Sequence, residues 1–122
     1  MSGPVLWAGV LAAGGIGALA RFTLDEAVSR RVVGAFPAGT LAVNGSGAFA
    51  LGMLTGLDVS ATATVLVGTG LIGAYTTFST WMLETHRLAE DRRPGLALWN
   101  IAGSVAVGMA LAAAGWGLGS VI

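Results

Sequence analysis

The chain has 122 residues, of which 55% are hydrophobic and only 10% are charged, and its mean hydropathy is +0.81. Because soluble domains carry roughly 25% charged residues, this composition excludes an ordinary soluble domain and indicates an integral membrane protein. Six basic and six acidic residues give zero net charge without a basic tail, which argues against nucleic acid as a partner. The chain has no cysteine, so disulfides, thiol catalysis and thiolate metal sites are excluded as well.

Charge-free stretches divide the chain into four long apolar segments. They cover residues 1–20, 32–57, 59–83 and 94–122. Each is near or above the ~20 residues that a helix needs to cross a bilayer. We therefore predict an all-α membrane protein with one transmembrane domain over residues 1–122. Its four transmembrane helices are expected at about 4–24, 37–57, 61–83 and 95–120.

The first predicted span carries one charged residue near its end, Arg21. An arginine at this position can reach the membrane interface with its long side chain, which by itself would explain it. The alternative is that its charge raises the local concentration of an anion at the mouth of a pore. The residue alone leaves both interpretations open.

The second predicted span contains a polar pair, Thr40 and Asn44, four residues apart and therefore on one helix face. An amide exposed to lipid is costly, so Asn44 is expected to face the interior of the bundle. There it either bonds to a neighbouring helix or uses its N–H donors to replace water around a passing anion.

Small residues recur at every fourth position in two spans. They are Ala48, Gly52 and Gly56 in the second span, and Ser104, Gly108 and Ala112 in the fourth. Such ridges allow helices to approach closely within a bilayer. Because four short helices have little interior of their own, we also expect a second chain to pack against this one.

The third predicted span is poorly suited to one continuous helix. Gly68, Gly70 and Gly73 weaken it, and a run of hydroxyl side chains follows from Thr76. We predict a break at mid-membrane, where freed backbone carbonyls can bind a hard cation such as Na⁺. Residues 68–73 also fit the glycine pattern of dinucleotide sites. That motif works only between a strand and a helix, so we reject nucleotide binding.

Beyond the expected break, Thr76, Thr80 and Glu84 recur every four residues and are predicted to share one helical stripe. Phe78 and Trp81 are three residues apart on a neighbouring face. These two side chains are either ordinary packing residues or rings whose positive edges attract an anion.

The sequence offers no arrangement typical of catalysis. Its only histidine, His86, lies at the end of the third span, and there is no second histidine or cysteine to complete a metal site. A Ser-His-Asp arrangement is not expected around a single histidine outside the core. We predict that the protein is not an enzyme.

Taken together, these motifs resemble the Fluc/CrcB family of fluoride channels. The match runs in chain order through GGIGA at 14–18, with Arg21 after it, GTLAVN at 39–44, GAFALG at 47–52 and GAYTTFST at 73–80. Ser104 and Gly108 in the fourth span also suit the family pattern.

The resemblance implies a fluoride-selective channel in the cell (plasma or inner) membrane that lowers cytoplasmic fluoride by passive export. It implies an antiparallel dimer with two pores and a structural Na⁺, not transported, held at the dimer centre by backbone carbonyls of both chains. Carried over by motif position, those carbonyls belong to Gly73 and Thr76. The fluoride path would then involve Asn44, Phe78, Ser79, Thr80, the residue at position 81 and Ser104, with Arg21 and Glu84 near the pore mouth.

Two positions depart from the family pattern. Trp81 stands where the family has a second phenylalanine, and it adds an N–H donor and bulk to the positive ring edge. Asn100 stands at a position of the fourth span that is often tyrosine. Both differences bear on whether every pore built with this subunit conducts.

Two other classes remain open from the sequence. One is a small drug or cation exporter, which is also an antiparallel dimer of four short helices. A protein of that class is expected to have a carboxylate inside the first span, and residues 1–20 contain none. The other is a non-conducting structural membrane subunit, against which the hydroxyl run and Asn44 argue.

The arginines predict a fixed orientation in the membrane. With four spans, residues 25–36 and 84–94 share one side, and both termini and Asp58 share the other. All six basic residues are arginines on or next to the first side, which the positive-inside rule places in the cytoplasm. A subunit with this bias inserts one way. The sequence therefore favours an oppositely oriented paralogue as the partner, with pairing to itself as the alternative.

Overall fold

The computed structural model describes residues 2–122, and every regular element among them is helical. The elements follow one another in the chain with short connections. They are α1 (Gly3–Arg31), α2 (Ala38–Gly56), α3 (Ala61–Ala63), the π-helix η1 (Thr64–Ile72), α4 (Gly73–Tyr75), α5 (Ser79–Glu90) and α6 (Pro94–Val121).

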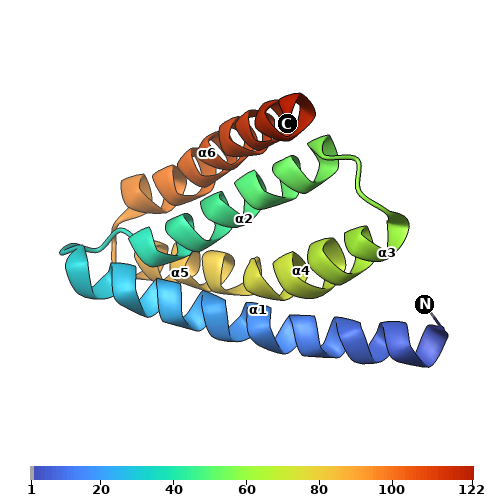
Figure 1. Ribbon diagram of the computed structural model, residues 1–122. Helices are drawn as coiled ribbons and strands as arrows, with labels where there is room; N and C mark the ends of the chain where they lie inside the picture. The colour runs from blue at the N-terminus through green and yellow to red at the C-terminus, as the bar shows by residue number, and fades with distance from the viewer. Residues whose placement is uncertain (1) are drawn as a thin grey trace.

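The chain runs back and forth along one direction (Figure 1). Both termini and the turn at 57–60 lie at one end of the molecule, and the turns at 32–37 and 91–93 lie at the other. Prolines mark two of the helix starts, since Pro37 is the residue before α2 and Pro94 is the first residue of α6. A proline is tolerated there because the N–H that it lacks would have no partner within the helix.

Three helical stretches are long and apolar enough to cross a membrane: Gly3–Arg31, Ala61–Glu90 and Pro94–Val121. The second of these contains the connected elements α3 to α5. The remaining helix, α2, has 19 residues and includes Asn44 and several glycines. The structure therefore supports a multi-pass membrane protein built of helices.

Helices α2 and α6 pack backbone against backbone. A Cβ atom added to Gly52 would lie 2.1 Å from the carbonyl oxygen of Ala112, and one added to Gly115 would lie 2.1 Å from that of Phe49. The predicted small-residue contact is thus present at Gly52 and Ala112. Gly108 has no such contact within this chain, because a Cβ atom there would have nothing within 4 Å.

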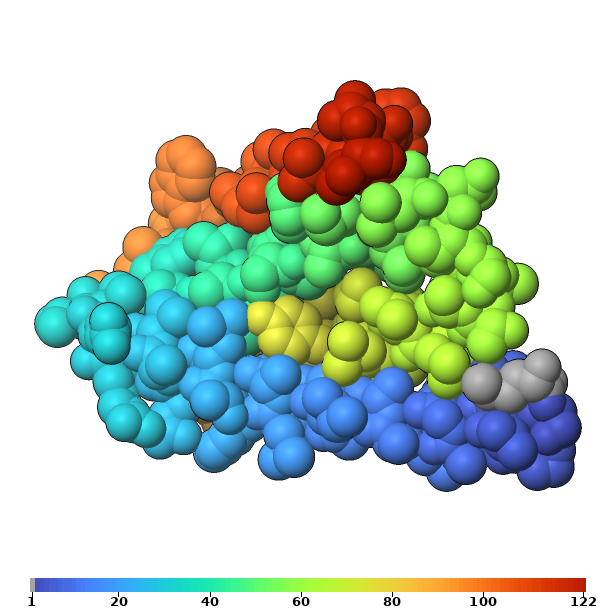
Figure 2. Space-filling view, in the orientation of Figure 1, coloured from blue at the N-terminus to red at the C-terminus, as the bar shows by residue number. Residues whose placement is uncertain are grey.

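Most large apolar side chains lie on the outside, as expected for a protein solvated by lipid. Among the described residues, the buried hydrophobic side chains are only Val43, Ile72, Leu88 and Ala97. In the space-filling view, atoms of the third helical stretch lie recessed in a furrow between α1 and α2 (Figure 2).

Candidate functional site

The third helical stretch changes conformation at Thr76. Helix α4 ends at Tyr75, Thr76 is extended (φ −80°, ψ 156°), and α5 begins at Ser79. The π-helix η1 leads into this point and contains Gly68 and Gly70. The predicted stripe of Thr76, Thr80 and Glu84 is wrong for Thr76. Because its backbone is extended, it does not continue the face of α5.

Asn44 of α2 pairs with the backbone of Thr77 at this point. Its Nδ2 donates to the Thr77 carbonyl at 2.8 Å, and its Oδ1 accepts from the Thr77 N–H at 2.8 Å. The amide therefore satisfies both backbone groups of a residue that has left the helix. The interpretation of Asn44 as a link between helices is confirmed, and one of its N–H groups remains for another acceptor.

Thr77 itself caps the following helix. Its hydroxyl oxygen accepts from the N–H of Thr80 at 3.2 Å, which is the bond of a typical N-cap. Because the Thr77 N–H goes to Asn44, the Gly73 carbonyl loses its usual helical donor. Within residues 2–122, no hydrogen bond reaches the carbonyl oxygens of Gly73 or Thr76.

Two recesses adjoin the break and share Asn44 and Trp81. One has a volume of about 360 Å³ and is lined in part by Gly73, Thr76 and Phe78. The other, of about 280 Å³, lies along α6. Its lining residues are Asn44, Trp81, Ser104, Val105, Gly108 and Met109. The structure thus brings Asn44, Phe78, Trp81 and Ser104 to one region, as the sequence predicts.

Two further residues of the predicted path lie close to this region without lining either recess. Ser79 is exposed and Thr80 is half-buried, both in the first turn of α5. Phe78 precedes them and is 71% exposed. Its ring contacts that of Trp81 edge to face, with centroids 5.7 Å apart and planes at 82°. This arrangement points a polarised ring edge at a neighbouring ring face.

Trp81 does not offer its N–H to the recesses. Its Nε1 donates to the backbone carbonyl of Asn100 at 2.9 Å. The expectation of an additional donor on the path at position 81 is therefore wrong. Asn100 is completely buried, and its Nδ2 donates to the Thr85 hydroxyl at 2.8 Å. It links α5 to α6 and does not line either recess.

A third recess, of about 350 Å³, lies between the turn at 32–37 and the C-terminal half of α5. Glu84 and Arg87 line it. The Glu84 carboxylate accepts a hydrogen bond from the buried hydroxyl of Thr40, with 2.5 Å between the oxygens. Glu84, predicted to lie near a pore mouth, lines this recess. Arg21 is not among the lining residues, and Arg87 supplies the positive charge there instead.

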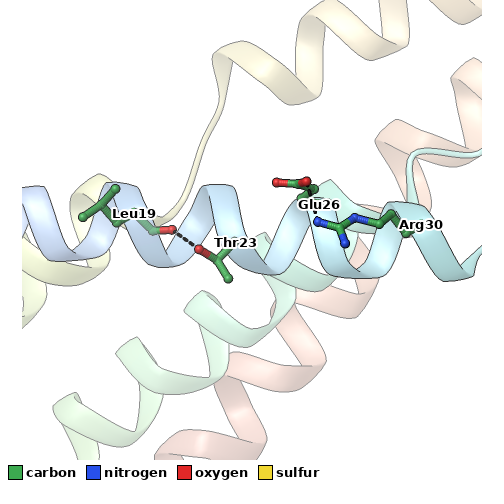
Figure 3. Close-up of polar contacts among 4 residues, drawn as sticks. All are labelled: Leu19, Thr23, Glu26 and Arg30. Atoms are coloured by element: carbon green, nitrogen blue, oxygen red, sulfur yellow. Dashed lines mark hydrogen bonds and ion pairs between the residues drawn. The ribbon is translucent and has the colours of Figure 1, made fainter.

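The outer face of α1 carries another charged pair. Arg30 binds Glu26 one turn earlier, and Thr23 donates to the Leu19 carbonyl at 2.8 Å (Figure 3). Both charged side chains are largely exposed, so the pair contributes little to stability. Of the six arginines, all within the described residues, only Arg30 forms an ion pair.

Sequence reasoning missed three residues of this region. The sequence shows Thr77 only as part of a run of hydroxyl side chains. It does not predict that Thr77 pairs with Asn44 or that it caps α5. Its position three residues before Thr80, in front of an amphipathic segment, is the available signal for a cap. Arg87, three residues after Glu84, could have been found by helical spacing. Nothing in the local sequence indicates that Thr85 binds Asn100.

Comparison with known proteins assigns the family. A family model described as CrcB-like protein, Camphor Resistance (CrcB), matches residues 8–116. The chain belongs to the CrcB family.

Several relatives support this assignment. A protein named Fluoride-specific ion channel FluC 2 from Mycobacterium tuberculosis (strain H37Rv) is 54% identical over 110 residues, covering 90% of this chain and 87% of the relative. FluC 2 of Mycolicibacterium paratuberculosis is 51% identical over 122 residues, covering both chains completely. FluC 1 of Leifsonia xyli subsp. xyli is 42% identical over 119 residues, covering 94% of this chain and 85% of the relative.

Membership decides between classes that the sequence left open. The family consists of ion channels, so the protein is not an enzyme. The alternative of a drug exporter is set aside for the same reason. The existence of relatives numbered 1 and 2 fits a family with paralogous subunits.

Proposed function

We propose that the protein is a subunit of a fluoride-selective channel that lets fluoride leave the cytoplasm passively. The observation that carries this proposal is the recess bounded by Asn44, Phe78 and Trp81, found in a chain whose relatives are named fluoride-specific channels. No titratable group lines that recess or the adjoining one along α6, so proton coupling has no evident carrier there.

The chemistry of the region suits a small, strongly hydrated anion. Asn44 keeps one N–H donor after pairing with Thr77, and Ser104 contributes a hydroxyl. Phe78 adds the positive edge of an aromatic ring without a fixed charge. Donors of this kind can replace water stepwise, whereas a strong fixed cation would hold the anion too tightly for conduction.

Flux from liposomes tests this function. Vesicles containing the protein, with its partner if one is needed, should release fluoride to an electrode far faster than they release chloride. Equal rates for the two anions would contradict selectivity. Absence of flux with every candidate partner would leave the non-conducting structural subunit as the explanation.

We place all four long helical stretches across the cell membrane, including α2. Its 19 residues would span about 28 Å at 1.5 Å per residue, close to the thickness of the hydrocarbon core. It runs parallel to α6 and packs along it. In this placement the break at Thr76 lies near the middle of the membrane.

We assign the carbonyl oxygens of Gly73 and Thr76 to a structural Na⁺ that is not transported. Neither oxygen receives a hydrogen bond within residues 2–122, and such carbonyls at the end of a helix suit a hard monovalent cation. Two oxygens are too few to complete the coordination of Na⁺. A second subunit that supplies the same pair would account for the rest and would place the ion at the centre of an antiparallel dimer.

The partner we favour is an oppositely oriented paralogue. Both turns next to the arginine-bearing segments lie at one end of the molecule, and the termini lie at the other (Figure 1). A six-to-zero bias in basic residues fixes the orientation with the arginines in the cytoplasm. Cysteine labelling from outside intact cells tests this. Ser120→Cys should react and Ser29→Cys should not, whereas equal labelling would indicate dual insertion and a homodimer.

A further inference from the structure

Two buried polar atoms of α6 lack a hydrogen-bond partner. Among the described residues they are the only such side-chain atoms, namely Asn100 Oδ1 and Ser104 Oγ. Asn100 is 0% exposed, and the two residues lie one helical turn apart. An unpaired buried acceptor is costly, so a pair of them on one helix face calls for a ligand.

The orientation of the Asn100 amide follows from its neighbours. Its other terminal atom lies 2.8 Å from the Thr85 hydroxyl and 3.4 Å from the Trp81 carbonyl. The Thr85 hydroxyl already donates to that carbonyl at 2.8 Å and therefore needs a donor itself. Only the amide nitrogen satisfies both contacts, so the oxygen of Asn100 is the atom left without a partner.

The two atoms without partners determine which kind of ligand can bind them. The amide oxygen is an acceptor only, so it repels an anion and requires a donor. The serine hydroxyl can accept and donate. Side chains four residues apart on a helix have Cβ atoms about 5–6 Å apart, a separation that one water molecule can bridge. We infer that a water molecule is bound between Asn100 Oδ1 and Ser104 Oγ and donates to both.

This water would determine the direction of the Ser104 hydroxyl. Ser104 lines the recess of about 280 Å³, although its Oγ atom is buried. Once Ser104 Oγ accepts from the water, its own hydrogen is free for an acceptor on the side of this recess. A chain of hydrogen bonds then runs from the buried amide oxygen through the water to a donor at the recess, and each bond polarises the next. Asn100 is thereby a positioning residue that acts through Ser104 and contacts no ion itself.

The water itself can be tested without any variant. In an experimental structure of the assembled protein that resolves ordered waters, density is expected within hydrogen-bond distance of both atoms. No density there, or a direct Asn100–Ser104 bond, would overturn the inference. This measurement is independent of ion conduction, so it stands even if the proposed channel function fails.

The positioning role rests on the proposed function and is tested by fluoride flux in a double-mutant cycle. Asn100→Leu should lower fluoride flux about fivefold, the change expected when one ordinary hydrogen bond to the ion is lost. In a Ser104→Ala background, Asn100→Leu should have no further effect. Additive losses would contradict an action through Ser104.

Thr85→Val provides the matched control. It removes the hydroxyl that Asn100 Nδ2 binds but keeps the side chains of Asn100 and Ser104, which hold the proposed water. If Asn100 merely ties α5 to α6, Thr85→Val should reproduce the loss of flux, and the positioning role would be refuted. If Asn100 acts through the water, the effect of Thr85→Val should be the same with Ser104 or Ala at position 104.

Discussion

Replacing Asn44 by leucine should destabilise the fold as well as impair conduction. Asn44→Leu keeps the approximate size of the side chain but removes both hydrogen bonds to the backbone of Thr77, each 2.8 Å long. These bonds hold the break of the third helical stretch against α2. The variant therefore loosens the geometry on which the proposed sodium and fluoride sites both depend.

The size of the effect follows from the two bonds that are lost. Hydrogen bonds between helices in membranes contribute about 0.6 kcal/mol on average and at most about 1.7 kcal/mol. Two of them give an expected loss of about 1–3 kcal/mol in the free energy of unfolding. Thr77 is half-buried beside a recess, so water can replace part of what is lost and keep the effect within this range.

Reversible unfolding in mixed micelles, followed by circular dichroism, measures this difference. Ser46→Ala is the control, because Ser46 lies on the same helix and binds the Tyr75 hydroxyl at 2.7 Å from an exposed position. It should change stability by less than ~0.5 kcal/mol. Equal stabilities for Asn44→Leu and Ser46→Ala would refute the conclusion that Asn44 holds the break at Thr76 and Thr77 against α2.

Three further predictions concern the ion sites and the packing. Phe78→Ile should strongly reduce fluoride flux but change stability by less than ~0.5 kcal/mol, because the ring is 71% exposed; unchanged flux would return Phe78 to a packing role. Gly115→Ala should cost about 1–3 kcal/mol through its contact with the Phe49 backbone, whereas Gly117→Ala, with open space around it, should not destabilise in the same unfolding assay. Replacing Na⁺ by a large organic cation should lower the dimer fraction measured by crosslinking in detergent, and an unchanged fraction would contradict a structural ion.

The sequence was most informative where a local pattern has one physical solution. The charge-free segments predict the long helices, and Gly73 followed by Thr76 locates the region where helical conformation stops. The contact of Gly52 with α6 also followed from the spacing of small residues. In each case the cause lies within a few residues of the feature, so the chain itself carries the signal.

Pairings between distant residues could not be predicted in the same way. Asn44 and Thr77 are 33 positions apart, and the amide could equally have faced any polar group of the bundle. The indole of Trp81 turns to the carbonyl of Asn100, an acceptor that every residue possesses. Which face of α6 meets α2 is likewise not determined by the spacing of small residues alone.

The break offers opposite partial charges to the two ions that we propose for it. The end of α4 presents carbonyl oxygens, whereas the start of α5 presents N–H groups, so the two sides carry opposite partial charges. Asn44 stands between them and satisfies Thr77 on both sides with one amide. If both ends were satisfied by their own helices, neither ion would find a ligand. The Asn44 side chain, bound to Thr77, therefore separates the proposed sodium ligands, Gly73 and Thr76, from the proposed fluoride path, which begins at Phe78.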